Sequence, residues 1–196
     1  ILRGPNIKPF PLSEPLAETI DAKVSLKVED NITTDHIMPA GAKILPLRSN
    51  IPEISKYCFA VCDETFHDRA LALGKSIIIG GANYGQGSSR EHAALAPLYL
   101  GVKAVITKSF ARIHMANLIN AGIIPMTFEN ESDYDRVSQD DELKIENVKS
   151  QIETGNTVKV TNLTKGFDFN VNVNFSQRQK DMIFAGGLLN YTKQNA

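Results

Sequence analysis

The chain has 196 residues, of which 42% are hydrophobic and 22% charged, enough to form one well-buried core. A formal net charge of -1, without a long Lys/Arg run, argues against nucleic acid or an anionic membrane as a partner. No apolar stretch approaches the roughly 18 residues of a membrane span, and the start of the chain lacks a signal-peptide pattern. We therefore expect one soluble domain in the cytoplasm.

The N-terminal segment is predicted to be a linker. It begins ILRGPNIKPFP without an initiator Met, and prolines stand at positions 5, 9, 11 and 15. Such a composition is typical of segments between domains. We expect residues 1–20 to be a linker from a longer chain and residues 21–196 to form the folded domain.

The first part of the domain is predicted to hold one strand and two short helices. AKVSLKV, residues 22–28, alternates like a half-buried strand, and DNITTDHIMPAGAKIL after it indicates a polar loop. Helices are predicted over 52–59 and 63–73. Cys58 should face the core by helical spacing, and two cysteines are too few for a disulfide framework or a tetrahedral zinc site.

The middle of the chain predicts a parallel sheet. Strands are expected at SIIIGG, VKAVITKSF and IIPMTF, and the two segments between them, SREHAALAPLYLG and FARIHMANLINAG, have helical patterns that end at glycine. This βαβαβ order implies right-handed crossovers. The first helix should be capped by Ser88 or Ser89 and kinked at Pro97.

The last third predicts short strands and one helix. A polar, acidic stretch follows Phe128, and the strand candidates TVKVTNL and FDFNVNVNF come next. Asn alternates with apolar residues in FNVNVNF, so one face of that strand should be wet and the other packed. A single helix is expected from about Gln177 to Tyr191.

The glycine- and serine-rich loop between the first predicted strand and helix of this sheet is the candidate functional element. A glycine-rich turn into a helix leaves backbone N–H groups free to bind an anion. Arg90 supplies a fork suited to a carboxylate, although the helix dipole alone would favour an acid there. These features alone leave two interpretations open, a small-anion site and a capped structural loop.

A dinucleotide or nucleotide phosphate is excluded as the anion. Gly85 and Gly87 give GxG, but Arg90 stands where the third glycine should be. Lys108 and Ser109 occupy the end of the second strand, where a ribose-binding acid would be needed, and the lysine of a P-loop is absent.

Two long motifs in the same order resemble the C-terminal swivelling domain of the aconitase family. GANYGQGSSREHAAL continues into LGVKAVITKSFARIHMANLINAGIIPMTF, and ITTDHIMPAGA precedes them. The resemblance extends over nearly the whole chain, including ILRGPNIKPFP and DYDRVSQDDEL. The related small subunit of isopropylmalate isomerase shares GSSREHAAL, but Asp35-His36-Ile37 and SFARIH favour aconitase. The resemblance implies an α/β fold of three layers, β/β/α, around the βαβαβ centre.

The resemblance also implies site residues. Ser88 would be the catalytic base, with Ser89 and Arg90 binding a substrate carboxylate beside it. Arg48 would be a second substrate-binding arginine, although its spacing differs by about one residue from the family's pattern. Asp35 matches the active-site aspartate and would orient an arginine.

Three further residues are possible supporting groups. Gly87 would let the backbone approach the substrate, His36 adjoins Asp35 and would shape the turn or the site, and His92 lies in the first turn of the helix. None of the histidines is expected to bind metal.

The implied reaction is the isomerisation of citrate to isocitrate through cis-aconitate. In that family a 4Fe-4S cluster acts as Lewis acid. Other domains of the full-length enzyme should hold it, because Cys58 and Cys62 do not match its ligands. The partners are thus the cluster-bearing domains and a tricarboxylate, and the isolated domain should be inactive. The alternatives are a homologous hydro-lyase for homocitrate or isopropylmalate and a non-catalytic anion-binding module.

Overall fold

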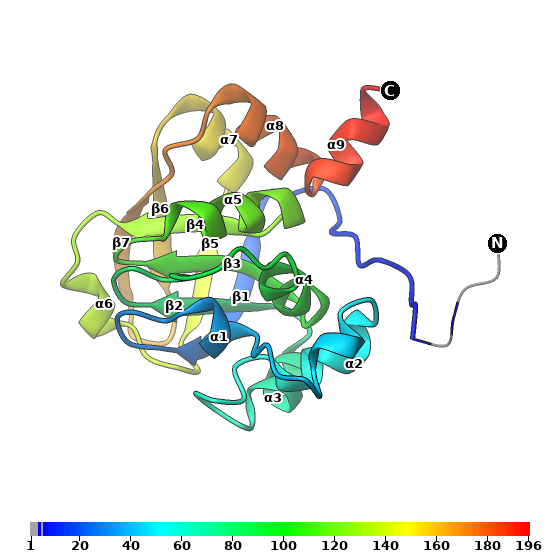
Figure 1. Cartoon of the computed structure of the whole chain (residues 1–196). Coiled ribbons are helices and arrows are strands. Elements are labelled where there is room, and N and C mark those ends of the chain that lie inside the picture. Colours follow the sequence, from blue (N-terminus) through cyan, green and yellow to red (C-terminus); the bar gives the residue numbers. More distant parts are fainter. Residues whose placement is uncertain (1–3, 5) are drawn as a thin grey trace.

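The computed structural model describes residue 4 and residues 6–196 of the chain and shows a mixed α/β domain (Figure 1). Its strands are β1 (Ile20–Lys27), β2 (Ser76–Gly80), β3 (Val102–Thr107), β4 (Ile124–Phe128), β5 (Glu142–Ile145), β6 (Thr157–Asn162) and β7 (Phe167–Asn172). Its α-helices are α1 (Thr34–Ile37), α2 (Ile51–Ile54), α3 (Phe66–Leu73), α4 (His92–Tyr99), α5 (Arg112–Ala121), α6 (Asp133–Arg136), α7 (Val148–Thr154), α8 (Gln177–Ala185) and α9 (Leu188–Gln194). Short 3-10 turns lie at Leu45–Leu47 and Ser55–Tyr57.

The strands form a closed barrel in the order β1-β2-β3-β4-β7-β6-β5. The first four strands run parallel to one another, as the predicted βαβαβ centre requires, and β7, β6 and β5 pair antiparallel. The barrel closes where β5 pairs antiparallel with β1, with Ile20 opposite Ile145. The parallel layer β1–β4 and the antiparallel layer β5–β7 are therefore joined at both edges, through the β4–β7 pair and the β1–β5 pair.

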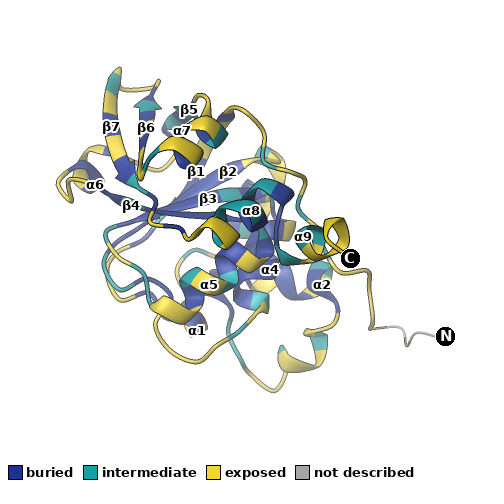
Figure 2. Cartoon of the chain, turned by 90° about the horizontal axis from the view of Figure 1, so that it is seen from above, coloured by how far each residue is buried: buried dark blue, intermediate teal, exposed yellow. Residues whose placement is uncertain are grey.

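Alternate residues of the parallel strands serve two cores, because successive side chains of a strand point to opposite faces. Ile77 and Ile79 of β2 pack inside the barrel, whereas Ile78 packs outward with residues of α4 and α5. Figure 1 shows α4 and α5 in front of β2, β3 and β4, and in Figure 2 these strands are mostly buried, with only Lys103 and Thr127 of intermediate burial. The predicted three-layer β/β/α arrangement is confirmed.

Three predictions about elements are wrong in detail. The stretch expected to be a polar loop after β1 includes α1, and Ile37 and Met38 within it are fully buried. The alternating burial of β1 stops at Val24, since Ser25 and Leu26 are buried as well. The final helix is two helices, because Gly186 and Gly187 have φ of 84° and 107° and end α8 before α9 begins.

The N-terminal segment has no helix or strand between residue 6 and Thr19. Residues 6–10 are exposed, and Figure 2 shows this part of the segment at the edge of the domain. It is nevertheless attached at two places: the backbone N–H of Lys8 donates to the Ser49 carbonyl at 3.0 Å, and further along the N–H of Leu16 donates to the Phe184 carbonyl and Asn190 Nδ2 to the Ser13 carbonyl. The linker prediction covers residues 1–20, of which 1–3 and 5 lie outside the described residues.

Candidate functional site

The glycine-rich loop, residues 81–91, connects the carboxyl end of β2 to α4. Contrary to the prediction, neither Ser88 nor Ser89 caps this helix: α4 begins at His92, after Glu91, with no side-chain hydrogen bond at its N-terminus. Serine is a favoured N-cap type, which is why the sequence pattern suggested this role. Both hydroxyls are exposed in the loop instead and are available to a ligand.

The backbone of the loop presents free donors ahead of α4. Within the part of the chain that the structure describes, no protein group accepts a hydrogen bond from the N–H groups of residues 87–91. The first turn of a helix carries unpaired N–H groups and a partial positive charge, so these donors and α4 together favour an anion at Ser88 and Ser89.

A ladder of hydrogen bonds holds this loop against the segment after β1. Gly81, Gly85 and Gln86 donate backbone N–H groups to carbonyls of that segment, and Thr34 donates back to the Gln86 carbonyl at 2.8 Å. Asp30 adds a side-chain contact, since its Oδ1 accepts from the Ala82 N–H at 2.7 Å. The two motifs that resemble the aconitase family are far apart in sequence, but these hydrogen bonds hold them side by side in the fold.

This ladder brings Asp35 to Arg90. Arg90 Nη1 donates to Asp35 Oδ1 at 2.5 Å and to the carbonyl of Met38 at 3.0 Å. The hydrogen bond from Arg90 lowers the pKa of Asp35 from its ordinary value, so the aspartate is charged at neutral pH. Only 15% of the Arg90 side chain is exposed, against 64% for Asp35. The two Nη1 hydrogens are occupied, which leaves the Nε–Nη2 edge, the edge that binds a carboxylate through two parallel hydrogen bonds.

Two glycines are required at this loop by geometry. Gly85 has φ of 83°, and a Cβ there would lie 2.3 Å from the ring of His114. Gly87 has φ of 116°, and a Cβ there would lie 3.1 Å from Thr34 Oγ1. Residues with side chains are strained in this backbone region, and at Gly85 the side chain would also collide with α5.

The two histidines predicted to support the site have different settings. His36 is the third residue of a capping box at α1: its Nδ1 accepts from the Thr33 N–H at 3.0 Å, so it shapes the turn that carries Asp35. His92 is half-buried at the start of α4, and its Nε2 is buried without a partner among the described residues. Burial lowers the pKa of His92, and the charges of Arg90 and Arg48 lower it further.

Arg48 is less closely connected with the loop than Arg90 is. It is exposed and borders a shallow hollow beside the N-terminal segment, and no described residue links it by a hydrogen bond to Ser88, Ser89 or Arg90. The positive charge of Arg48 nevertheless contributes to the lowered pKa of His92 at the start of α4.

Helix α5 contributes two residues that sequence reasoning did not assign to the site. His114, 1% exposed, packs beneath Gly85, and Asn117 Nδ2 donates to Ser89 Oγ at 3.4 Å. The two residues are three positions apart and so share one face of the helix. The spacing of these two polar residues in the predicted helix FARIHMANLINAG was the available signal.

The described residues do not fit an iron–sulfur cluster or another metal. No group of three His, Cys, Asp or Glu side chains that could hold a metal ion occurs among residues 4 and 6–196. Cys58 is buried with its thiol pKa raised by burial, and Cys62 lies four residues on, so neither forms part of a ligand set.

No helix in the same part of the chain is long and apolar enough to cross a membrane.

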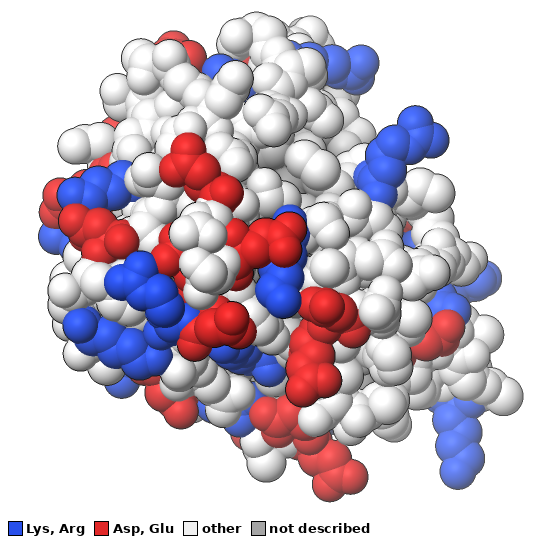
Figure 3. All heavy atoms as spheres, turned by 90° about the vertical axis from the view of Figure 1, so that its left-hand side faces the viewer, with Lys and Arg blue, Asp and Glu red and all other residues white. Residues whose placement is uncertain are grey.

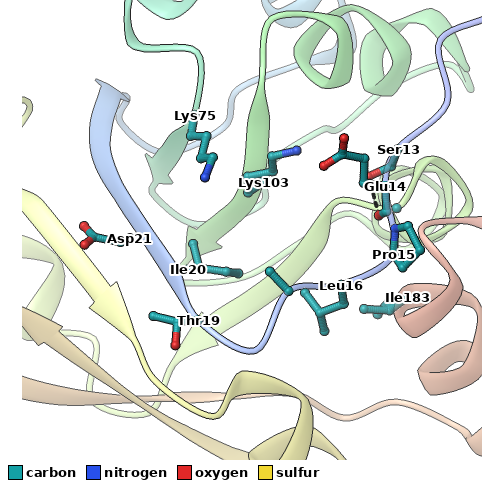
Figure 4. A pocket seen from close by; sticks show the side chains of 12 residues that line it. Ser13, Glu14, Pro15, Leu16, Thr19, Ile20, Asp21, Lys75, Lys103 and Ile183 are labelled. Atoms are coloured by element: carbon teal, nitrogen blue, oxygen red, sulfur yellow. Dashed lines mark hydrogen bonds between the residues drawn. The ribbon is translucent and has the colours of Figure 1, made fainter.

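A second hollow lies at the opposite end of the parallel strands. It has a volume of about 100 Å³ and is lined by the N-terminal segment, Lys75 and Lys103 (Figure 4). Lys103 and Glu14 point toward each other in this view, and Asp21 points away. None of the predicted site residues lines it. On the side of the molecule where α6 lies, Lys and Arg side chains gather at the lower left of the view with Asp and Glu side chains among them (Figure 3).

The sequence matches known proteins over most of its length. Residues 62–131 match the aconitase C-terminal domain family. A probable mitochondrial aconitate hydratase of Dictyostelium discoideum is 36% identical over 90% of this chain, which spans 26% of that relative. The 3-isopropylmalate dehydratase small subunit 2 of Archaeoglobus fulgidus is 37% identical over 86% of this chain and 92% of its own length. A crystal structure of 3-isopropylmalate dehydratase from Methanocaldococcus jannaschii superposes with a TM-score of 0.74 at 30% identity, covering 90% of this chain and 95% of that one.

Proposed function

The chain belongs to the aconitase C-terminal domain family, and from that premise we propose that it supplies the catalytic base and carboxylate-binding groups of an aconitate hydratase. It spans about a quarter of the aconitate hydratase it matches, 26% of that relative's length, so the complete activity needs further domains. The observation that carries the proposal is the loop at residues 81–91. Within the described residues, it brings together two serines that do not cap α4, backbone N–H groups without a partner, and Arg90, whose guanidinium forms hydrogen bonds through Nη1 alone.

Ser88 is proposed to remove the proton next to a substrate carboxylate. A serine hydroxyl is a poor base at neutral pH unless its alkoxide is stabilised. The unpaired N–H groups of residues 87–91 and the N-terminus of α4 supply such stabilisation without moving, because the hydrogen-bond ladder fixes the loop. In the hydration step that follows, the same hydroxyl would give the proton to the carbon that had carried the leaving hydroxyl, while hydroxide adds to the carbon that had lost the proton, and the product is the isomer.

Arg90 and Asp35 are proposed to act as one unit. Asp35 holds Nη1 and thereby turns the Nε–Nη2 edge of the guanidinium toward a substrate carboxylate. Arg48 would bind a second carboxylate after moving closer, since it is exposed and free to adjust. A tricarboxylate offers enough negative charge to engage both arginines.

A 4Fe-4S cluster, held by other domains, is proposed to supply a Lewis acid for the leaving hydroxyl. This chain's part is confined to the proton and the carboxylates. Because the base and the cluster would lie on different domains, the isolated chain should be inactive, and the linker at residues 1–20 would tether a domain that swings over the substrate. A cytoplasmic location stays a prediction from composition, and the Dictyostelium relative is named as mitochondrial.

Two alternatives follow from specific observations. Similarity to an isopropylmalate dehydratase small subunit over 92% of its length favours a homologous hydro-lyase for isopropylmalate or homocitrate as the second candidate. A non-catalytic anion-binding module would use the same free donors but would not need Ser88 as a base.

Steady-state turnover by the full-length, cluster-reconstituted enzyme tests the proposal. Wild type and Ser88→Ala are compared on citrate, homocitrate and isopropylmalate, with Ser132→Ala, a serine near α6, as the matched control. We expect one substrate to be dehydrated at a rate that falls by about 10³-fold or more in Ser88→Ala, with an unchanged cluster spectrum. Near-wild-type turnover by this variant would refute the role of Ser88, and the preferred substrate separates the enzyme alternatives.

A further inference from the structure

Helix α5 forms a second wall of the site beside the glycine-rich loop. His114 lies beneath Gly85, and one turn later Asn117, which is partly buried, reaches Ser89. Within the described part of the chain, the amide of Asn117 is the only side chain that forms a hydrogen bond to the hydroxyl of Ser88 or Ser89. The loop therefore has one side-chain contact that determines how a serine hydroxyl is oriented.

In this contact Asn117 donates the hydrogen bond and the hydroxyl oxygen of Ser89 accepts it. An amide NH₂ group can only donate, so it occupies a lone pair of Ser89 Oγ and cannot receive the hydroxyl hydrogen. The hydrogen of Ser89 must then point elsewhere, and no described residue accepts a hydrogen bond from this hydroxyl, which lies in the loop before α4. Because Ser89 is exposed, its hydroxyl can donate to a bound ligand, and a substrate carboxylate is a suitable acceptor.

We propose that Asn117 is a positioning residue that fixes the hydroxyl of Ser89 as a hydrogen-bond donor to the substrate carboxylate. This inference rests on the proposed function and names a residue on α5, outside the glycine-rich loop at residues 81–91. It also explains why α5 is held so close, with the ring of His114 where any side chain on Gly85 would lie. The distance of 3.4 Å is suited to a contact that shortens when substrate draws the hydroxyl into line.

A double-mutant cycle in the full-length, cluster-reconstituted enzyme tests whether Asn117 acts through Ser89. Asn117→Ala should raise KM for the preferred tricarboxylate about fivefold with little change in kcat, because ground-state and transition-state carboxylate binding are lost together. Asn117→Asp should raise KM about 20-fold or more, because a carboxylate accepts the Ser89 hydrogen and reverses the contact. In a Ser89→Ala background, neither substitution should change KM by more than about twofold.

Two controls separate this inference from simpler effects. Asn120→Asp places the same charge one turn further along α5, at an exposed position, and should leave KM unchanged. Thermal unfolding of each variant detects loss of structure, which would lower the melting temperature without depending on Ser89.

The outcomes are distinct. Equal effects of the Asn117 variants with and without Ser89 would overturn the inference, since Asn117 would then act independently of that hydroxyl. Wild-type KM for Asn117→Asp would also overturn it, because the hydroxyl would then already donate to residue 117. If Ser88→Ala abolishes turnover in the same series, either result leaves the proposed function standing, whereas an active Ser88→Ala enzyme refutes the function itself.

Discussion

Lowering the pH from 7 to 5 should reduce the free energy of unfolding by about 2 kcal/mol through a single buried residue, His114. Its ring is 1% exposed, and neither nitrogen has a partner among the described residues. Burial lowers the pKa of His114 from 6.5 to about 4. The ring is thus neutral in the folded protein at pH 5 but mostly protonated in the unfolded chain.

The sign and size follow from proton binding in the two states. Between pH 6.5 and about 4 the unfolded chain binds more protons at this residue, so stability falls as the pH is lowered through this window. The full difference between the two pKa values corresponds to about 3 kcal/mol below pH 4. Above pH 7 the residue is neutral in both states and contributes no pH dependence.

Denaturant unfolding of wild type and His114→Phe at pH 8, 7 and 5, followed by circular dichroism, measures this contribution. Phe has a similar ring and no titrating group, so stability at pH 7 should change by at most about 1.5 kcal/mol. The variant should lose about 2 kcal/mol less than wild type between pH 7 and 5, and the two proteins should change in parallel between pH 8 and 7. His114→Leu repeats the comparison if Phe does not fit. Equal losses in wild type and both variants would refute the reasoning.

Two further predictions concern the loop. Gly85→Ala should lower the free energy of unfolding by about 3 kcal/mol, because a Cβ would lie 2.3 Å from the His114 ring. The control Gly166→Ala has φ of 69° and nothing within 4 Å, so it should lower the free energy of unfolding by only about 1 kcal/mol. Equal losses in denaturant titrations would contradict the close packing of α5. Arg90→Lys keeps the charge but loses the Nε–Nη2 edge, so kcat/KM should fall about 100-fold at nearly unchanged stability; wild-type kinetics would show that the guanidinium does not bind a carboxylate.

The central βαβαβ unit was predictable from sequence because its signals are local. β-branched runs such as Ile77–Ile79 and the glycines after α4 and α5 determine elements within a few residues. Closure of the barrel was not predictable in this way, since it depends on Ile20 pairing with Ile145 over more than 100 residues. The break between α8 and α9 did have a local signal, because two adjacent glycines each disfavour a helix by about 1 kcal/mol.

The site shows a similar division. Arg90 was recognisable as a residue against the helix dipole, but its pairing with Asp35 depends on the hydrogen-bond ladder between two distant segments. The prediction that Ser88 or Ser89 caps α4 was wrong, because a serine in this position of the sequence can serve equally well as a helix cap or as a ligand-binding residue. Only the position of the first turn of α4, at His92, decides between them.

Unpaired buried polar atoms gather around this loop, and their position supports a functional reading of it. Of the six buried side-chain atoms without a hydrogen-bond partner in the described residues, four belong to Thr34, His92 and His114. Each such atom costs stability, so native proteins keep few of them. Thr34 and His114 lie against Gly87 and Gly85, and His92 begins the helix that follows. A loop that served only as a capped connection would gain from satisfying these atoms or replacing them with apolar groups. Their concentration here is expected if, as proposed above, a bound anion and a second domain complete the hydrogen bonding of the site.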